Sequence, residues 1–336
     1  MPDMLAHYLV AEEAARRLDG AGDALLAADV WDAYKVGAQG PDVFFYANLL
    51  RRRGRPDLAH LTHRHRMSAA FRSLLDLATA LPADQRRVAL AFVAGYAAHL
   101  CLDAAAHPWV LYWTGDITEG ADPEIKAQAF RRHGVLEASI DVILRQEQGG
   151  GPDWLRRRRL LRLPAPQRKI VAELLSAMLR EVFAVPFSPE ECRAAFRNMD
   201  RVYGTMSDPY AFPTRLLATA APLIDRSGAM RTQIYPETPS PVAADLFATQ
   251  RHWYYPSVPD EPRTATFREI IEAATAETAR CLQAIAAVTN GDGTSEDAVE
   301  VIGDRSMLTG VACEDPRPRV AFAPDLNRIW GDGAPA

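Results

Sequence analysis

Cysteine is scarce in this chain, which has only four cysteines among its 336 residues. They lie far apart, at Cys101, Cys192, Cys281 and Cys313, and no two of them form a C-x-x-C pair. The sequence therefore indicates neither a zinc ribbon nor a framework of disulfide bonds. Free thiols packed in the core of a protein from a reducing compartment are the simplest interpretation.

Long hydrophobic runs, a secretory signal and an excess of basic charge are also missing. No stretch of about 18 apolar residues occurs, so we expect no membrane-spanning segment. The first residues lack a basic region, an uninterrupted apolar core and a small-residue cleavage site, which predicts a cytoplasmic protein. The net charge of −5 gives no general attraction to nucleic-acid duplexes or to anionic lipid.

Strand signals are nearly absent, because apolar and polar residues rarely alternate. Apolar residues instead recur at spacings of three and four, which predicts an all-α fold. We expect one multi-helix domain over residues 1–290, with an irregular tail over residues 291–336 packing on it, and an ordered proline-rich loop over 235–262. Helices are predicted over residues 5–19, 67–80, 84–107, 124–147, 167–184, 189–201, 209–219 and 264–289.

Histidines gather near the start of the chain, where seven of the eight lie within the first 133 residues. His99, Asp103 and His107 are spaced i, i+4 and i+8 in an apolar segment, so a helix would project all three from one face. Unpaired polar groups there cost several kcal/mol unless they are satisfied. The triplet favours a metal ion over histidines bonded to the backbone or to Asp103. Pro108 predicts that the helix ends or kinks there.

Other side chains have spacings typical of ligands. His133 and Glu137 are four residues apart, which suits either a chelating pair or an ordinary hydrogen-bonded pair. Asp42 follows a tight turn in GAQGPD, where an aspartate serves as a ligand, a base or a helix cap. His7 lies on the first predicted helix, where a single histidine is more often structural.

The string HLTHRHR offers three more histidines, His60, His63 and His65. A helix would place His60 and His63 on one face, whereas His65 would point elsewhere. We expect at least two of the three to lie on the surface.

Five histidines, two aspartates and one glutamate thus occupy helical, ligand-like positions in the first 137 residues. This set is too large for one tetrahedral zinc ion and suits two or three metal ions. Nitrogen and oxygen ligands without thiolate fit Zn²⁺ best, with manganese and iron as the other candidates.

The order of these motifs resembles the zinc-dependent phospholipase C family. That all-helical family includes bacterial enzymes that hydrolyse phosphatidylcholine and, more distantly, the P1 nucleases. The chain is most similar to its cytoplasmic, leaderless bacterial branch. The resemblance extends to about residue 315 and is carried by the starting pattern MPxxxxHY and the strings GAQGPDVFFY, GYAAHLCLDAAAHPW and RHWYYP.

The resemblance implies the role of each candidate residue. Among the three clustered histidines it selects His63, because the following string MSAAF lies at the family's offset from its histidine. It makes Asp42 the base or the group that orients water. Phe44, Phe45 and Tyr46 could shape a leaving-group pocket, although core packing is the simpler role. One zinc ion would be held by Asp42, His63, His99 and Asp103, a second by His107, His133 and Glu137, and a third by His7 and the bridging Asp103.

This chain departs from the secreted members of the family in two ways. Those members complete the third site with the amine and carbonyl of a processed N-terminal tryptophan. This chain begins Met1-Pro2, so a third metal would need Asp3, the terminus at Pro2 or a water molecule. The spacing from Asp103 to His107 is also two residues shorter, which keeps the ligands on one helical face.

We therefore expect a zinc-dependent hydrolase that cleaves a small-molecule or lipid phosphodiester with metal-activated water. One alternative is a helical di-iron oxygenase, but the candidate ligands include little glutamate. A second alternative is a binding protein that needs metal only to fold. An HD-type phosphohydrolase is disfavoured because the chain has no adjacent His-Asp doublet.

Overall fold

The structure is a computed structural model. It describes residues 4–18, 20–22, 25–47, 57–117, 121–150, 160–206, 236–315, 317–319 and 321–331. Helices dominate these residues, whose only sheet is one antiparallel two-stranded hairpin, so the all-α prediction is confirmed. The helix predicted over 209–219 lies outside the described residues.

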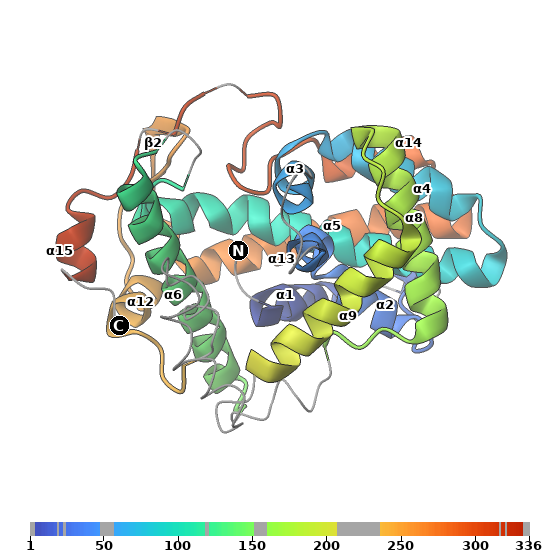
Figure 1. Cartoon of the computed structure of the whole chain (residues 1–336), viewed down its shortest axis with the longest axis horizontal. Coiled ribbons are helices and arrows are strands. Elements are labelled where there is room, and N and C mark those ends of the chain that lie inside the picture. Colours follow the sequence, from blue (N-terminus) through green and yellow to red (C-terminus); the bar gives the residue numbers. More distant parts are fainter. Residues whose placement is uncertain are drawn as a thin grey trace.

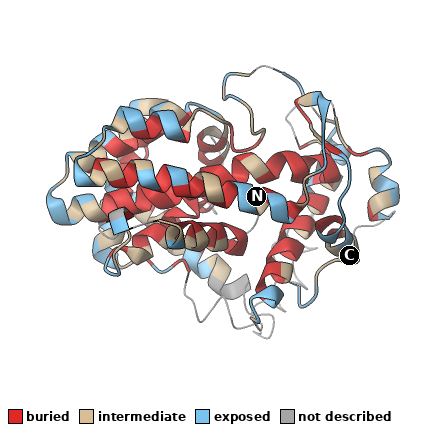
Figure 2. Cartoon of the chain, turned by 180° about the vertical axis from the view of Figure 1, so that it is seen from behind, coloured by how far each residue is buried: buried red, intermediate tan, exposed pale blue. Residues whose placement is uncertain are grey.

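Helix α5 (Ala83–Thr114) runs through the middle of the molecule and packs most extensively on α13 (Phe267–Asn290) and α2 (Trp31–Gly37) (Figure 1). It is buried on all sides over most of its length, which explains why its sequence shows no polar face (Figure 2). Of the two outcomes predicted at Pro108, an end or a kink, the end is wrong, since the helix continues to Thr114. The missing proline N–H removes one hydrogen bond, and the buried residues that follow hold the helix together.

The same helix is long and apolar enough to cross a membrane by length and composition alone, although we expected no such segment from the sequence. However, 94% of its most apolar window is buried inside the protein, which is the environment of a core helix. Among the described residues no other helix meets these criteria.

Two glycines let α2 and α5 approach closely. A Cβ atom on Gly37 would lie 2.3 Å from the carbonyl oxygen of Phe92, and one on Gly95 would lie 2.2 Å from that of Tyr34. Only glycine therefore fits at this crossing. The contact delivers the segment after α2, which contains Asp42, to the side of α5.

The other elements surround this centre, and most predicted helices begin and end within a few residues of the observed ones. In chain order they are α1 (Met4–Arg16), η1 (Gly20–Gly22), η2 (Gly40–Tyr46), α3 (Leu58–Arg64), α4 (Met67–Thr79), α6 (Pro123–Glu147), α8 (Ala165–Phe183), α9 (Pro189–Met206), α12 (Pro241–Ala248), β1 (Trp253–Tyr255), β2 (Val258–Arg263), α14 (Ser295–Ile302) and α15 (Leu326–Trp330).

Two predicted irregular regions contain regular structure. The proline-rich stretch 235–262 includes α12 and the hairpin β1–β2, whose register shifts at a bulge after Tyr254. The tail after residue 290 is not irregular throughout, because it forms α14 and α15. A capping box between Thr294 and Asp297 stabilises the start of α14. Trp330 of the tail donates its indole N–H to the carbonyl of Trp113 on α5 at 2.8 Å, so the tail contacts the central helix. The division of the chain into a domain over residues 1–290 and a tail stays a prediction.

Candidate metal centre

The structure brings the eight candidate ligands into three groups, each with ligand atoms within 4.8 Å of one another. All eight side chains are buried. The groups are His7, His99 and Asp103; Asp42, His63 and His99; and His107, His133 and Glu137.

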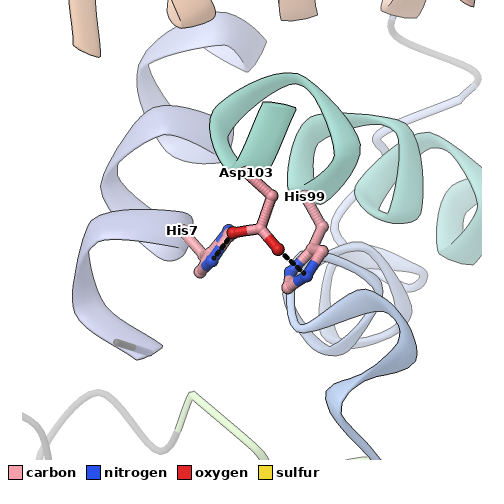
Figure 3. Close-up of side chains that lie close together, drawn as sticks. All are labelled: His7, His99 and Asp103. Atoms are coloured by element: carbon pink, nitrogen blue, oxygen red, sulfur yellow. Dashed lines mark ion pairs between the residues drawn. The ribbon is translucent and has the colours of Figure 1, made fainter. Parts of the chain in front are cut away.

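Asp103 lies at the centre of the arrangement, on the middle of three successive turns of α5. Its Oδ1 is 3.2 Å from Nε2 of His7, and its Oδ2 is 3.2 Å from Nε2 of His99 (Figure 3). The same Oδ2 lies 3.6 Å from Nδ1 of His107 and 4.0 Å from Nε2 of His63. One carboxylate therefore faces histidines from all three groups.

Helix α1 brings His7 to Asp103, and a carboxylate on α6 holds the start of α1. Asp141 accepts hydrogen bonds from the backbone N–H groups of Leu5 at 2.7 Å and of Ala6 at 2.9 Å. These are first-turn donors that have no partner within their own helix. The His7 ring stacks on the His99 ring, with centroids 4.0 Å apart and planes inclined by 12°.

Asp42 and His63 form the second group with His99. Nε2 of His63 lies 3.0 Å from Oδ1 of Asp42, and Nε2 of His99 lies 3.8 Å from the same oxygen. Asp42 lies within the helical turn η2, which begins at Gly40 with a φ of +46°. A Cβ atom there would lie 2.6 Å from the His99 ring, so the glycine lets the segment GAQGPD wrap closely around that histidine.

The third group joins α5 to α6. Nε2 of His133 lies 2.8 Å from Oε1 of Glu137, and Nε2 of His107 lies 4.0 Å from the same oxygen. The His107 and His133 rings stack with centroids 5.7 Å apart.

Three of the histidines donate the N–H at Nδ1 to a backbone carbonyl, which can only accept a hydrogen bond. His63 donates to Ala59 at 2.5 Å and His99 donates to Ala38 at 3.1 Å. His107 donates to Met307 at 2.6 Å. Each bond leaves Nε2 without a proton in the neutral ring, so the lone pair of a metal ligand points into the centre.

The buried polar atoms fit a metal ion. Nε2 of His7, Nε2 of His99 and both carboxylate oxygens of Asp103 are buried, and apart from the ion pairs among themselves none has a hydrogen-bond partner with good geometry among the described residues. Such groups cost several kcal/mol when nothing satisfies them. In a tetrahedral zinc site with bonds of about 2.0 Å, ligand atoms lie about 3.3 Å apart. The separations of 3.2 Å on both sides of Asp103 match that spacing.

Burial favours the neutral form of four of these groups when no cation is nearby. It lowers the pKa of His7, and it lowers the pKa of His107 and of His133 well below the ordinary value. Burial also raises the pKa of Glu137 to about 8. Neutral imidazole is the form that binds a metal, and a bound cation would favour the ionised form of Glu137.

Asp103 and His99 behave differently because they form a charged pair. Burial opposes ionisation of Asp103, but His107, His99 and His7 outweigh it and hold the pKa of Asp103 well below its usual range. Burial also opposes protonation of His99, but Asp103 and then Asp42 outweigh it and raise the pKa of His99. Asp103 is thus the permanent negative charge of the centre.

The structure separates the three histidines of the HLTHRHR string. His63 is buried beside Asp42, His60 is half-buried, and His65 is exposed after the end of α3. Only His63 belongs to one of the three groups.

The aromatic residues after Asp42 also differ from one another. Phe44 and Tyr46 are buried in the core, whereas Phe45 is 44% exposed and its ring centroid lies 5.5 Å from that of His63. Met1, Pro2 and Asp3, named above for a third metal, lie outside the described residues.

Sequence reasoning missed two residues that support the ligands. Asp141 is four residues after Glu137 and could have been found as a further acidic residue on the same helical face. Met307 acts through backbone atoms, which leave no signal in a sequence. It lies in the tail that we expected to be irregular.

Comparison with known proteins agrees with this geometry. No curated protein and no solved structure matches the chain. Residues 6–184, just over half of the chain, match the family model described as zinc dependent phospholipase C. All eight candidate ligands lie inside that range, and together the match and the three groups support a zinc-binding, metal-dependent hydrolase. The chain therefore belongs to the zinc-dependent phospholipase C family.

Proposed function

We propose that this protein is a zinc-dependent phosphodiesterase that hydrolyses a phospholipid or a similar phosphodiester with an activated water molecule. The observation that carries the proposal is Asp103, a fully buried carboxylate whose two oxygens lie 3.2 Å from His7 on one side and from His99 on the other. This bridging position suits neighbouring metal ions that share a ligand, as in hydrolases that act on phosphate esters.

The ligands divide into two ends of one centre. His7, Asp42, His63 and His99 gather with Asp103 at the first end, and His107, His133 and Glu137 form the second end. Zinc bound there would lower the pKa of a water molecule towards neutrality and offset negative charge on the phosphoryl oxygens. Two ions satisfy both ends, and His7 is the ligand that a third ion would use.

Asp42 is the residue that we assign to proton transfer. Its carboxylate lies 3.0 Å from Nε2 of His63 and belongs to the ligand group of His63 and His99. A carboxylate there can orient the attacking water and accept its proton. Phe45, exposed beside His63, offers an apolar surface for the part of the substrate that leaves.

The first experiment is elemental analysis of the purified protein, with metals counted per chain. Two or three zinc ions are expected. Two iron ions with an absorption change on exposure to oxygen would favour a di-iron oxygenase instead. A folded protein without metal would contradict the proposal, because the histidines would then be structural.

The second experiment measures hydrolysis of bis-(p-nitrophenyl) phosphate and of phosphatidylcholine in detergent micelles, before and after chelation. We expect chelation to abolish turnover and zinc to restore it. His63→Ala should lose activity, whereas the matched variants His60→Ala and His65→Ala should keep it. Zinc in the protein without cleavage of either substrate would leave a metal-stabilised binding protein as the better interpretation.

A further inference from the structure

The tail outside the family match contains a turn that lies against the metal centre. Residues 305–313 follow α14 and form the turn. Two interactions close it: the N–H of Ser306 donates to the carbonyl of Val311 at 2.8 Å, and Arg305 pairs with Ala312 in an isolated β-bridge. Met307 is fully buried within it. In Figure 1 this part of the chain is the orange-red loop beside α3.

The peptide groups of Met307 connect two ligand-bearing helices. The carbonyl of Met307 accepts the N–H at Nδ1 of His107 on α5 at 2.6 Å. Its N–H donates to the carbonyl of His63 on α3 at 2.8 Å. One residue of the tail thus bonds to a candidate ligand from each end of the centre.

The next residue of the turn reaches α6. Leu308 is buried in a small apolar cluster that includes Leu111 and Ala129. Leu111 is one helical turn after His107, and Ala129 is one helical turn before His133. Leu308 therefore packs between the two helices that supply the second end of the centre.

Gly310 fixes how closely the turn can approach α5. Its φ is +69°, and a Cβ atom on it would lie 2.4 Å from the carbonyl oxygen of Ala104 and 3.0 Å from the ring of Pro108. Pro108 has no N–H, so it cannot give the Ala104 carbonyl its usual helical hydrogen bond. The turn lies against α5 where the backbone of that helix lacks this bond, next to Asp103 and His107.

We infer that the turn 305–313 is a positioning element of the metal centre, which fixes the ring of His107 and the distance between α3, α5 and α6. The inference rests on the proposed zinc site but not on the proposed hydrolysis. His63 and His99 are held by Ala59 and Ala38, both inside the matched range. His107 takes the equivalent support from the tail.

The test compares Gly310→Ala with Gly291→Ala. Gly291 also has a positive φ, +81°, but a Cβ atom there would meet nothing within 4 Å. Both variants bear the same kind of backbone strain, and only Gly310→Ala pushes the turn away from α5. We expect Gly310→Ala to weaken zinc binding at the second end by about 10-fold to 100-fold, as loss of a supporting bond to a histidine ligand does elsewhere. Gly291→Ala should bind zinc like the parent protein.

The measurements are zinc retained under chelator competition and the visible spectrum of the Co²⁺-loaded protein, which reports ligand geometry. The zinc lost by Gly310→Ala should match that lost by His133→Ala rather than by His7→Ala. If a folded Gly310→Ala protein retains zinc and keeps the parent Co²⁺ spectrum, the inference is wrong. If Gly310→Ala does not fold, zinc retention by Leu308→Ala is compared with that by Gly291→Ala instead. Leu308→Ala removes only the contact of the turn with Leu111 and Ala129, so it disturbs the backbone less. A parent protein that binds zinc but cleaves no phosphodiester would contradict the proposed function and leave this inference standing.

Discussion

The two ends of the metal centre share one helix but differ in how they are supported. At the first end His7 and His99 stack 4.0 Å apart, and the supports come from Ala38 and Asp141. At the second end the histidine rings are 5.7 Å apart, and the carbonyl that orients His107 comes from Met307 in the tail. The groups that orient the His63 and His99 rings thus lie within the first 141 residues, whereas the ring of His107 at the second end is oriented by Met307 in the tail.

This difference shows that one ligand-bearing helix can carry two sites that depend on the tail to different extents. Asp103 faces both ends, so it couples them directly. Met307 also contacts both ends, because its N–H donates to the carbonyl of His63 and its own carbonyl accepts from His107. The other ligands belong to one end only. Substitutions should therefore fall into a small class that disables the whole centre and a larger class that affects one end.

Asp103→Asn should have the largest effect. Asparagine keeps the shape but loses the negative charge and one of the two acceptor oxygens, so the first end loses its shared ligand and His107 loses the charged group that faces it. We expect zinc content to fall most at the first end and hydrolysis to fall by about 1,000-fold, because metal ions contribute several kcal/mol to such reactions. Elemental analysis and the bis-(p-nitrophenyl) phosphate assay check this. Full activity in a folded Asp103→Asn protein would exclude Asp103 as a bridging ligand.

His7→Ala and His133→Ala should separate the two ends. His7 contacts only the first end, and removing it should cost about one zinc ion per chain at most while the second end stays loaded. His133→Ala should empty the second end and leave the ligands around Asp42 loaded. Metal counts on both variants decide the point. The same loss of metal from both would show that the ends fill together.

The sequence was informative about the ligands because helical spacing alone aligns side chains. His99, Asp103 and His107 could be placed on one face from their intervals, and the observed helix carries all three. The choice of His63 over His60 depended on a resemblance, because both fit one face of a short helix. Short helices such as α2 and α3, seven residues each, were missed since so few residues show no reliable period.

Contacts between distant segments could not be predicted from the sequence. Asp141 caps a helix that lies far from it in the sequence, and Met307 acts through its peptide groups, which every residue has. The glycines were more informative in retrospect. Gly40 and Gly310 mark the two places where a turn approaches α5 too closely for a side chain.

Asp141→Asn should have a smaller effect, confined to the first end. Asparagine can accept one of the two N–H groups of α1 but presents an amide to the other, so one buried donor loses its partner. The free energy of unfolding should fall by about 1–3 kcal/mol. His7 should bind its metal more weakly, while the second end is unchanged. Chemical denaturation and chelator competition test the two parts separately. Weaker binding at His133 would mean that α1 and α6 move together.

Cys281→Ala should have the smallest effect. Cys281 lies on α13, with its sulfur 3.7 Å from that of Cys101 on α5, and both are fully buried. The hydrogen bond between the thiols, together with burial, raises the pKa of Cys101 well above its ordinary value, so this thiol stays protonated and is a poor metal ligand. Cys101 is two residues after His99, which places it on the opposite side of the helix from the ligands.

For Cys281→Ala we therefore expect the free energy of unfolding to fall by about 1 kcal/mol because of the small cavity, with the zinc content of both ends unchanged. If thermal unfolding shows that loss and the metal counts stay at the parent level, the packing of α5 on α13 supports the helix without tuning either end. If zinc is lost from both ends together, the two ends do not bind zinc independently. The position of α5 then controls the whole centre.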